Sequence, residues 1–427
     1  MYIERFIEKI VIKYIDYKEY IAIIWPRQVW KTTFLKNLMK TYKNSFYYNF
    51  EDFSIRKDFE NNPIWFVKNH LGNNNKNILL FDEFQYVKNA GNLLKLIFDT
   101  FEDDIKIIIT WSSSLHLKEI WAKMTWRMFS FEMFWLSLEE ILLYKNIGYY
   151  NSKKYIESNF DLLNLDLNDE DFLSFSEISF LDKIKEIVDE YIIWWWMPAI
   201  VKSNSIEEKN IILSNFTQNY INKDIINLLK VRNIDKFSNL MITLSIIIWQ
   251  QIVIENLSND LWINIVTINE YLNYLHNTFI NKIINPYHKN SLNEIRKQKI
   301  EYFYDLWVRN YLIKNFNNLD IRIDNWHLLE NYIFLRLEQL KDKYIWLNYW
   351  REKNWNEVDF VIKMHDKLIP IEVKYQNFKK CEITTWMKKF NDIYLEQVKY
   401  SIVITKDFIN VCKFNDIKIY FIPYYLF

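Results

Sequence analysis

The chain has 427 residues, half of them hydrophobic, and its Lys plus Arg and Asp plus Glu totals are equal at 54 each. This length suits two or three domains with sizeable cores, and the balanced charge excludes a protein that is polybasic or polyacidic overall. The start MYIERFIEKI lacks the apolar core of a signal peptide, and no apolar run approaches the ~20 residues that span a bilayer. Cys381 and Cys412 have neither metal-binding spacing nor a disulfide framework. We therefore expect a soluble cytoplasmic protein with no membrane partner.

Glycine and tryptophan are present in abnormal proportions. Average usage of about 7% predicts roughly 30 glycines in a chain of this length. The chain has three glycines and 18 tryptophans. Turns and helix ends need glycine for positive φ, where a bulky residue is an outlier. The positions of the tryptophans therefore decide how the sequence is interpreted.

The first predicted elements form a phosphate-binding loop. Residues 20–33 read YIAIIWPRQVWKTT, an apolar strand over 21–24, a short loop and a helix that begins near residue 31. With glycine at positions 25 and 30 the loop matches the P-loop pattern G-x-x-x-x-G-K-[ST], in which backbone N–H groups surround a phosphate. A tryptophan side chain would fill the place of the nucleotide. The predicted ATP-binding segment is Trp25, Pro26, Arg27, Gln28, Val29, Trp30, Lys31, Thr32 and Thr33.

We hypothesise that UGA encodes glycine in the source organism and is written here as tryptophan. The same replacement turns ITWSSS (109–114) into ITGSSS and gives EKNWNEVDF (352–360) an Asn-Gly turn. Trp350, in an alternating segment, fits a true strand aromatic, whereas Trp65 and Trp194 are undecided. The alternative is that the tryptophans are real and the nucleotide site is plugged.

Further strands are predicted at residues 46–50, 78–81, 105–110 and 128–134, separated by helical stretches, as in a parallel α/β sheet. Lys31 is expected to reach the β- and γ-phosphates of ATP and Thr32 to bind Mg²⁺. The third apolar run ends in Asp82, expected to hold the Mg²⁺ shell, and Glu83, expected to polarise the attacking water. Ser112 follows the next strand as a candidate γ-phosphate sensor. Arg127 is a candidate arginine finger, in cis or in trans, or an ordinary surface arginine.

The middle of the chain is predicted to be helical. Residues 136–235 carry Leu and Ile at three- and four-residue spacing. Within 236–290, a short helix, a turn at Trp262 and an amphipathic helix over 265–275 suggest a helix-turn-helix. The basic stretch HKNSLNEIRKQK (288–299) adds clustered charge of the kind that contacts phosphates. DNA and a protein partner both remain candidates for this region.

The C-terminal part returns to α/β patterning. EVDFVI and LIPIEVK are predicted to be two strands, with Asp359 on the first and Glu372 and Lys374 on one face of the second. Two carboxylates and a lysine on one face fit a Mg²⁺ site in which the lysine stabilises hydroxide or phosphate charge. Glu330, in a helical segment, is a further candidate carboxylate. A solvated charged edge, or a nuclease-like fold kept for binding, is the alternative.

In combination, segments such as IIWPRQVWKTT, ILLFDEFQYVKN, YFYDLWVRN, HLLENYIFLRL, YWREKNWNEVDFVI and IPIEVK resemble prokaryotic AAA-type P-loop ATPases with a C-terminal domain of unknown function related to PD-(D/E)XK nucleases. The resemblance implies an α/β P-loop NTPase domain, a helical and winged-helix middle region and a C-terminal α/β nuclease-like domain. The boundaries expected are 1–145 for the ATPase domain, 146–235 for a helical lid or linker, 236–295 for a winged helix-turn-helix and 296–427 for the nuclease-like domain.

Three functions remain open at this stage. The first is an ATPase using ATP and Mg²⁺ to drive a conformational change that acts on DNA or a protein partner. The second is an ATP-regulated, Mg²⁺-dependent DNA nuclease using Asp359, Glu372 and Lys374, with Asp359 and Glu372 as metal ligands. The third is a binding scaffold, which follows if the tryptophans are real. The sequence leaves an oligomer possible.

Overall fold

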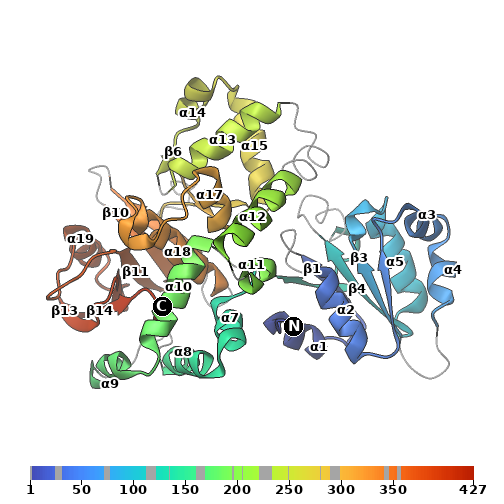
Figure 1. Ribbon diagram of the computed structural model, residues 1–427, viewed down its shortest axis with the longest axis horizontal. Helices are drawn as coiled ribbons and strands as arrows, with labels where there is room; N and C mark the ends of the chain where they lie inside the picture. The colour runs from blue at the N-terminus through green and yellow to red at the C-terminus, as the bar shows by residue number, and fades with distance from the viewer. Residues whose placement is uncertain are drawn as a thin grey trace. The chain divides into compact units, whose positions relative to one another are not determined.

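The computed structural model describes residues 2–24, 31–71, 77–111, 122–133, 135–159, 169–194, 197–203, 205–220, 233–248, 250–278, 280–288, 299–340, 346–352 and 357–427. The chain forms two compact units (Figure 1). The first comprises residues 1–140 with 196–212 and 277–279, and the second comprises 141–195, 213–276 and 280–427. The predicted end of the first domain at 145 lies close to this division. The boundaries predicted at 235 and 295 fall inside the second unit and stay predictions.

The first unit contains a five-stranded parallel sheet in the order β2-β3-β4-β1-β5. Its central strands β1, β3 and β4 are buried along their whole length, as continuous apolar runs in parallel sheets require. All five strands were predicted from the sequence, with ends that differ by at most two residues. The elements are α1 (Phe6–Lys13), β1 (Tyr20–Ile24), α2 (Lys31–Thr41), β2 (Ser45–Asn49), α3 (Phe53–Asn61), α4 (Pro63–Lys68), β3 (Asn77–Asp82), η1 (Phe84–Tyr86), α5 (Ala90–Phe101), β4 (Ile105–Trp111) and β5 (Met128–Glu132).

A buried lysine ties this sheet to the segment before β1. The Nζ atom of Lys106, on β4, donates to the carbonyl oxygens of Tyr14, Tyr17 and Glu19 at 2.8, 2.9 and 2.5 Å. Lys106 is fully buried, so these three bonds replace the water that its ammonium group would otherwise hold. The contact fixes the chain where it enters the strand that leads to the predicted P-loop.

The second unit begins with helices, as predicted, and continues with three helices and a small antiparallel sheet in the order β6-β8-β7. The predicted helix over 265–275 is confirmed as α15. Its elements up to β8 are α7 (Leu138–Lys145, which starts in the first unit), α8 (Ile147–Asn159), α9 (Asp169–Leu173), η2 (Ser174–Glu177), α10 (Leu181–Trp194), α13 (Ile234–Ile246), β6 (Gln251–Ile252), α14 (Ile254–Leu261), α15 (Ile265–Asn277), β7 (Asn281–Ile284) and β8 (Lys299–Phe303); α11 (Pro198–Lys202) belongs to the first unit, and α12 (Ile206–Tyr220) crosses the division.

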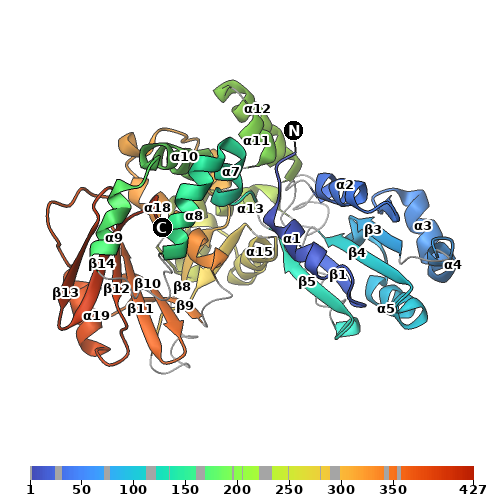
Figure 2. The same ribbon diagram turned by 90° about the horizontal axis from the view of Figure 1, so that it is seen from below.

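The C-terminal part is built on a six-stranded mixed sheet in the order β13-β14-β12-β11-β10-β9 (Figure 2). Strands β9, β10 and β11 are antiparallel, whereas β11, β12 and β14 run parallel. The two strands predicted at EVDFVI and LIPIEVK are confirmed as β10 and β11. The elements are α17 (Leu306–Leu312), η4 (Leu319–Ile321), α18 (Asn325–Gln339), β9 (Trp346–Arg351), β10 (Glu357–Met364), β11 (Lys367–Val373), α19 (Thr385–Ile393), β12 (Ser401–Thr405), β13 (Asn410–Phe414) and β14 (Ile417–Pro423).

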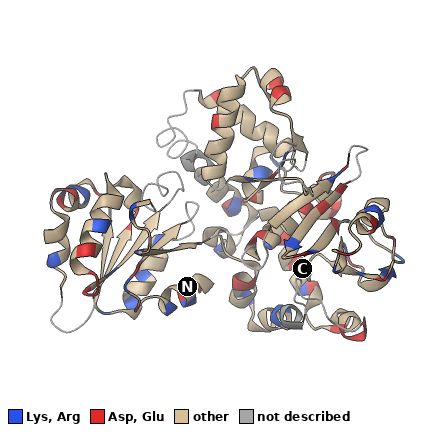
Figure 3. Ribbon diagram, turned by 180° about the vertical axis from the view of Figure 1, so that it is seen from behind, with Lys and Arg blue, Asp and Glu red and all other residues tan. Residues whose placement is uncertain are grey.

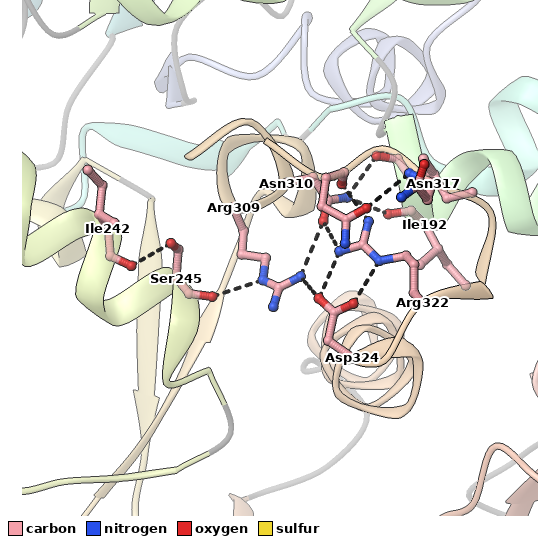
Figure 4. A network of polar contacts seen from close by, with 10 residues as sticks. Ile192, Ile242, Ser245, Arg309, Asn310, Asn317, Arg322 and Asp324 are labelled. Carbon is pink, nitrogen blue, oxygen red and sulfur yellow. Dashed lines mark hydrogen bonds and ion pairs between the residues drawn. The ribbon is translucent and has the colours of Figure 1, made fainter. Parts of the chain in front are cut away.

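A buried ionic network joins α17 and the start of α18 to α10 and α13 (Figure 4). Asp324 accepts hydrogen bonds from Arg322, at 2.8 Å for both Nε and Nη2, and also from Arg309. Arg309 donates to the carbonyl oxygen of Ser245 on α13 at 2.9 Å, and Asn310 donates to that of Ile193 on α10 at 2.8 Å. One carboxylate therefore compensates two guanidinium groups in the middle of the second unit.

Candidate functional site

The first candidate site lies at the carboxyl ends of β1, β3 and β4. Lys31 and Thr32 begin α2, so they stand at the N-terminus of a helix that follows β1, a position suited to phosphate. The loop residues Trp25, Pro26, Arg27, Gln28, Val29 and Trp30, and the sensor candidate Ser112, lie outside the described residues. The site can therefore be built from α2, β2, β3 and β4.

Asp82, at the end of β3, is the buried centre of this site. Its Oδ2 atom accepts a hydrogen bond from the Thr32 hydroxyl at 2.6 Å and another from the Tyr47 hydroxyl at 2.8 Å. Its Oδ1 atom accepts from the Thr110 hydroxyl at 2.5 Å and from the Glu83 backbone N–H at 3.1 Å. Four neutral donors, three from α2, β2 and β4 and one from the backbone after β3, therefore hold one carboxylate in a single orientation.

Glu83 follows Asp82 in a left-handed backbone conformation, with φ 55° and ψ 41°. This conformation is uncommon for a residue other than glycine, and such outliers gather at functional sites. The Glu83 carboxylate forms an ion pair with Lys31 and accepts a hydrogen bond from Gln85. The structure thus brings together the two residues predicted to act on phosphate and water, although they lie 52 positions apart.

The described residues fit a Mg²⁺ ion. Mg²⁺ in phosphate-binding sites takes one or two carboxylates or hydroxyls of the protein together with substrate phosphates. The Thr32 hydroxyl and the Asp82 carboxylate, in direct contact at the N-terminus of α2, are such a pair of oxygen donors. Thr33 is exposed on the same first turn of α2.

Arg127 lies at the opposite edge of the sheet. It precedes β5, whose first residue Met128 pairs with Tyr20 at the start of β1, whereas the P-loop follows the end of β1. Its Nε atom forms an ion pair with Asp99 at 2.9 Å. The interpretation of Arg127 as a cis arginine finger is therefore not supported. The whole length of β1 lies between Arg127 and the end of that strand, where the predicted P-loop begins.

The second candidate site is a group of acidic residues on the mixed sheet, where Figure 3 colours Asp and Glu positions of the ribbon red. Asp359 on β10 and Glu372 on β11 stand opposite each other, one position beyond the Phe360–Ile371 pair. The backbone N–H of Val373 donates to Asp359 Oδ2 at 2.6 Å, and Lys374 Nζ lies 2.7 Å from Glu372 Oε1. Asp359, Glu372 and Lys374 are therefore brought together as the sequence predicted.

Two further carboxylates join this group. Glu330, on α18, is buried and accepts a hydrogen bond from the Tyr302 hydroxyl at 2.6 Å. Glu357 lies two residues before Asp359, on the same face of β10, and its Oε2 atom is 3.4 Å from Arg351 Nε. Among the described residues, no group of three or more Asp, Glu, His or Cys side chains lies close enough together to hold a metal ion.

Burial perturbs the acid–base behaviour of this group. Burial, followed by repulsion from Asp359, raises the pKa of Glu372 to about 8 and that of Glu357 to about 7. Burial also raises the pKa of Asp359 and, more strongly, that of Glu330. Burial acts to lower the pKa of Lys374, but the charges of Asp359 and Glu372 outweigh it and raise that pKa. Several carboxylates that burial disfavours in the charged form, beside one lysine, are typical of a site that binds a cation or moves a proton.

Sequence reasoning missed Tyr47, Thr110, Tyr302 and Glu357. Strand alternation predicts that Tyr47 or Tyr48 faces the helix that carries Lys31, but only the register of β2 against β3 decides which. Thr110 was counted within a strand, and its role follows from the position of β4 between β1 and β3. Glu357 could have been found as the i−2 neighbour of Asp359 on the same strand face.

Three family models match parts of the chain. Residues 17–142 match the AAA domain, residues 185–319 match a domain of unknown function (DUF8612), and residues 327–426 match a second domain of unknown function (DUF4143). The parallel sheet and the Lys31, Thr32, Asp82 and Glu83 cluster lie within the first match. Residues 17–142 are therefore an AAA-type domain of the P-loop ATPase class.

Among whole proteins, the chain is 27% identical over 403 residues to the uncharacterized protein MJ1544 of Methanocaldococcus jannaschii, a match that covers 90% of this chain and 82% of that protein. Among solved structures, the Walker-type ATPase PABY2304 of Pyrococcus abyssi is 13% identical with a TM-score of 0.42, covering 73% of this chain and 96% of that one. The ORC1 protein of Aeropyrum pernix in complex with DNA is 10% identical with a TM-score of 0.31, covering 69% and 86%. At these TM-scores the structural likeness is too remote to bear on function.

In the described part of the chain, no helix combines the length and the apolar character that crossing a membrane requires.

Proposed function

We propose that this protein binds ATP in its AAA-type domain and hydrolyses it with Mg²⁺ to drive a conformational change. The observation that carries the proposal is the contact between Thr32, at the start of α2, and the buried Asp82. Lys31 would hold the β- and γ-phosphates, and Glu83, released from Lys31, would orient the attacking water. Mg²⁺, held by Thr32 and Asp82, would neutralise charge that develops on the phosphates.

We further propose that the native protein has glycine at most positions where a tryptophan stands in a predicted loop or turn, including Trp25 and Trp30. Trp126 and Trp262 adopt φ values of 63° and 53°. They are 91% and 85% exposed, so no packing compensates for the strained backbone. The indole Nε1 of Trp111 is buried without a hydrogen-bond partner in the described structure, although buried indoles usually find one. Trp350, by contrast, packs in the core at 5.4 Å from the ring of Phe390, in the manner of a true strand aromatic.

The full-length chain carrying W25G and W30G should hydrolyse ATP in a Mg²⁺-dependent reaction. The chain with both tryptophans should not, because a side chain in place of either P-loop glycine would prevent the close approach of the loop backbone to phosphate. Phosphate release with and without EDTA measures the difference. In the source gene, the codons for Trp25 and Trp30 should be UGA and that for Trp350 UGG. If all three are UGG and the glycine variant releases no phosphate, the scaffold function replaces the ATPase.

The elements α13, β6, α14, α15, β7 and β8 support a winged helix-turn-helix, with Trp262 as the left-handed turn between α14 and α15. Its partner is DNA or a protein. Helix α15 contains no Lys or Arg, so phosphate contacts would have to come from the basic stretch 288–299. Most of that stretch lies outside the described residues. DNA and a protein are therefore both proposed as the partner of this region.

A second candidate function is Mg²⁺-dependent DNA cleavage by the acidic group of the mixed sheet. The observation that favours it is the position of Asp359 opposite Glu372, with Lys374 2.7 Å from Glu372. Two carboxylates on adjacent strands fit a Mg²⁺ ion, and Lys374 would stabilise hydroxide or the developing phosphate charge.

Asp359→Ala should abolish Mg²⁺-dependent nicking of supercoiled DNA while ATP turnover persists. Because the pKa of Glu372 is raised to about 8, Glu372 is protonated at lower pH and must lose its proton to bind a cation. The nicking rate should therefore rise as the pH is raised towards about 8. Asp366→Ala, in the exposed turn between the same two strands, is the matched control. Nicking that survives Asp359→Ala rejects this function and leaves the ATPase intact.

A further inference from the structure

Tyr47 contacts the same carboxylate oxygen as the Thr32 hydroxyl. Its hydroxyl donates to Asp82 Oδ2 at 2.8 Å, and the Thr32 hydroxyl donates to that atom at 2.6 Å. Tyr47 lies on β2, the strand beside β3, and it faces Asp82 because Tyr48 pairs with Phe81 and side chains alternate along a strand. The other oxygen of Asp82 is held separately by Thr110 and by the Glu83 backbone. Tyr47 is thus the second of two donors on the oxygen nearest the predicted Mg²⁺ ligand.

The hydroxyl of Tyr47 can act only as a donor to Asp82. A carboxylate oxygen accepts and has no proton to give, so the phenol supplies the hydrogen of this bond. A hydrogen bond to a charged acceptor that is itself fully buried is among the stronger ones in proteins. Removing the hydroxyl would leave the Thr32 hydroxyl as the remaining described donor to Oδ2 and would weaken the hold on the orientation of the carboxylate.

Tyr47 also contacts the helix that begins with Lys31. The Nζ atom of Lys36, on α2, lies 5.7 Å from the centre of the Tyr47 ring, within the range of a cation–π contact. The residue therefore lies between α2 and β3, the two elements that supply Thr32 and Asp82. A side chain in this place controls how the two oxygen donors of the site stand to one another.

We propose that Tyr47 is a positioning residue of the nucleotide site, which holds Asp82 in the orientation that binds Mg²⁺ together with ATP. This inference rests on the proposed ATPase function. It predicts that Tyr47 contributes to the gain in ATP affinity that Mg²⁺ supplies, and contributes little to ATP binding without the metal.

The test measures the dissociation constant of ATP by calorimetric titration, in Mg²⁺ and in EDTA, on the full-length chain carrying W25G and W30G. The ratio of interest is the dissociation constant in EDTA divided by that in Mg²⁺. Tyr47→Phe should reduce this ratio about tenfold, the loss expected for one hydrogen bond to a charged group. The constant in EDTA should stay the same. Tyr48→Phe is the matched control, because Tyr48 carries the same hydroxyl one residue along the strand but directs it to His70.

Each outcome decides one question. Parent protein that binds no ATP in either condition rejects the ATPase itself. If Mg²⁺ raises the ATP affinity of Tyr47→Phe as much as that of the parent protein, the inference is rejected and the ATPase stands. The inference is also rejected if Tyr48→Phe loses as much of this Mg²⁺-dependent gain as Tyr47→Phe does. Tyr47→His, which keeps a ring N–H donor, should recover part of the ratio that Tyr47→Phe loses. If thermal unfolding shows Tyr47→Phe to be unfolded, Tyr47→Met replaces it as the variant without a hydrogen-bond donor. A ratio equal to that of the parent in the variant without a donor would contradict the inference.

Discussion

Lys31→Ala should abolish ATP turnover in the chain that carries glycine at positions 25 and 30. Lys31 is the only charged side chain at the start of α2, and its ammonium group is held against the site by Glu83. Loss of one preorganised charge donor in such a site costs about 10²–10³ in rate, and a phosphate-binding lysine should be at the upper end. Phosphate release at saturating ATP and Mg²⁺ measures the effect.

Lys40→Ala provides the control for that variant. Lys40 stands in the last turn of the same helix and is exposed, so its removal changes the net charge of α2 equally without touching the site. Turnover by Lys40→Ala should equal that of the parent. Turnover retained in Lys31→Ala would remove the P-loop assignment, whatever the codons at the tryptophan positions.

Asp324→Ala should destabilise the second unit by about 3–5 kcal/mol. The side chains of Arg309 and Arg322 are 3% and 0% exposed, and both depend on this one carboxylate. Breaking a buried ion pair by removing one partner leaves uncompensated charge in the interior, which is the source of the cost. Because the network also joins α10 and α13, loss of packing between helices should accompany it (Figure 4). Urea unfolding followed by circular dichroism measures the change.

The same network predicts how stability depends on pH. Burial acts to raise the pKa of Asp324, but hydrogen bonds from Arg322 and the charge of Arg309 outweigh it and lower that pKa. A lowered folded-state pKa contributes stability that is present above the unfolded value of about 3.9 and is lost as the pH falls towards the folded value. Asp324→Ala should therefore lack this part of the acid-induced loss below pH 4. Glu186→Ala, which removes an exposed ion pair with Lys183, should leave both stability and its pH dependence unchanged.

The P-loop domain was predictable because local patterns carry it. A buried parallel strand is a continuous apolar run whatever its neighbours, so five strands and the acidic pair at residues 82 and 83 follow from the sequence alone. The spacing of Lys31-Thr32 to that pair is also a property of the chain. Trp262, which the sequence places at a turn, has the positive φ that such a turn requires.

The side chains that contact Asp82 depend on the order and the register of the strands, which the sequence does not show. Strand β4 stands between β1 and β3, which brings Thr110 to Asp82, and the register of β2 selects Tyr47 over Tyr48. The parallel pairing of β5 with β1 places Arg127 beside the start of β1, at the other end of the strand from the residues that follow it. No local pattern contains this information, because strand order follows from long-range pairing.

The sequence by itself therefore predicted the five strands of the first sheet, the spacing of Lys31 and Thr32 to Asp82 and Glu83, and the acidic motif of the C-terminal strands. The tertiary structure alone decided which donors hold Asp82, and it brought Glu330 on α18, a candidate from the sequence, to the carboxylates of β10 and β11. It also decided that one aspartate neutralises two arginines between helices distant in the chain. The reason is physical: motifs specify chemistry through covalent spacing, whereas burial, charge compensation and hydrogen-bond partners exist only once separate elements pack together.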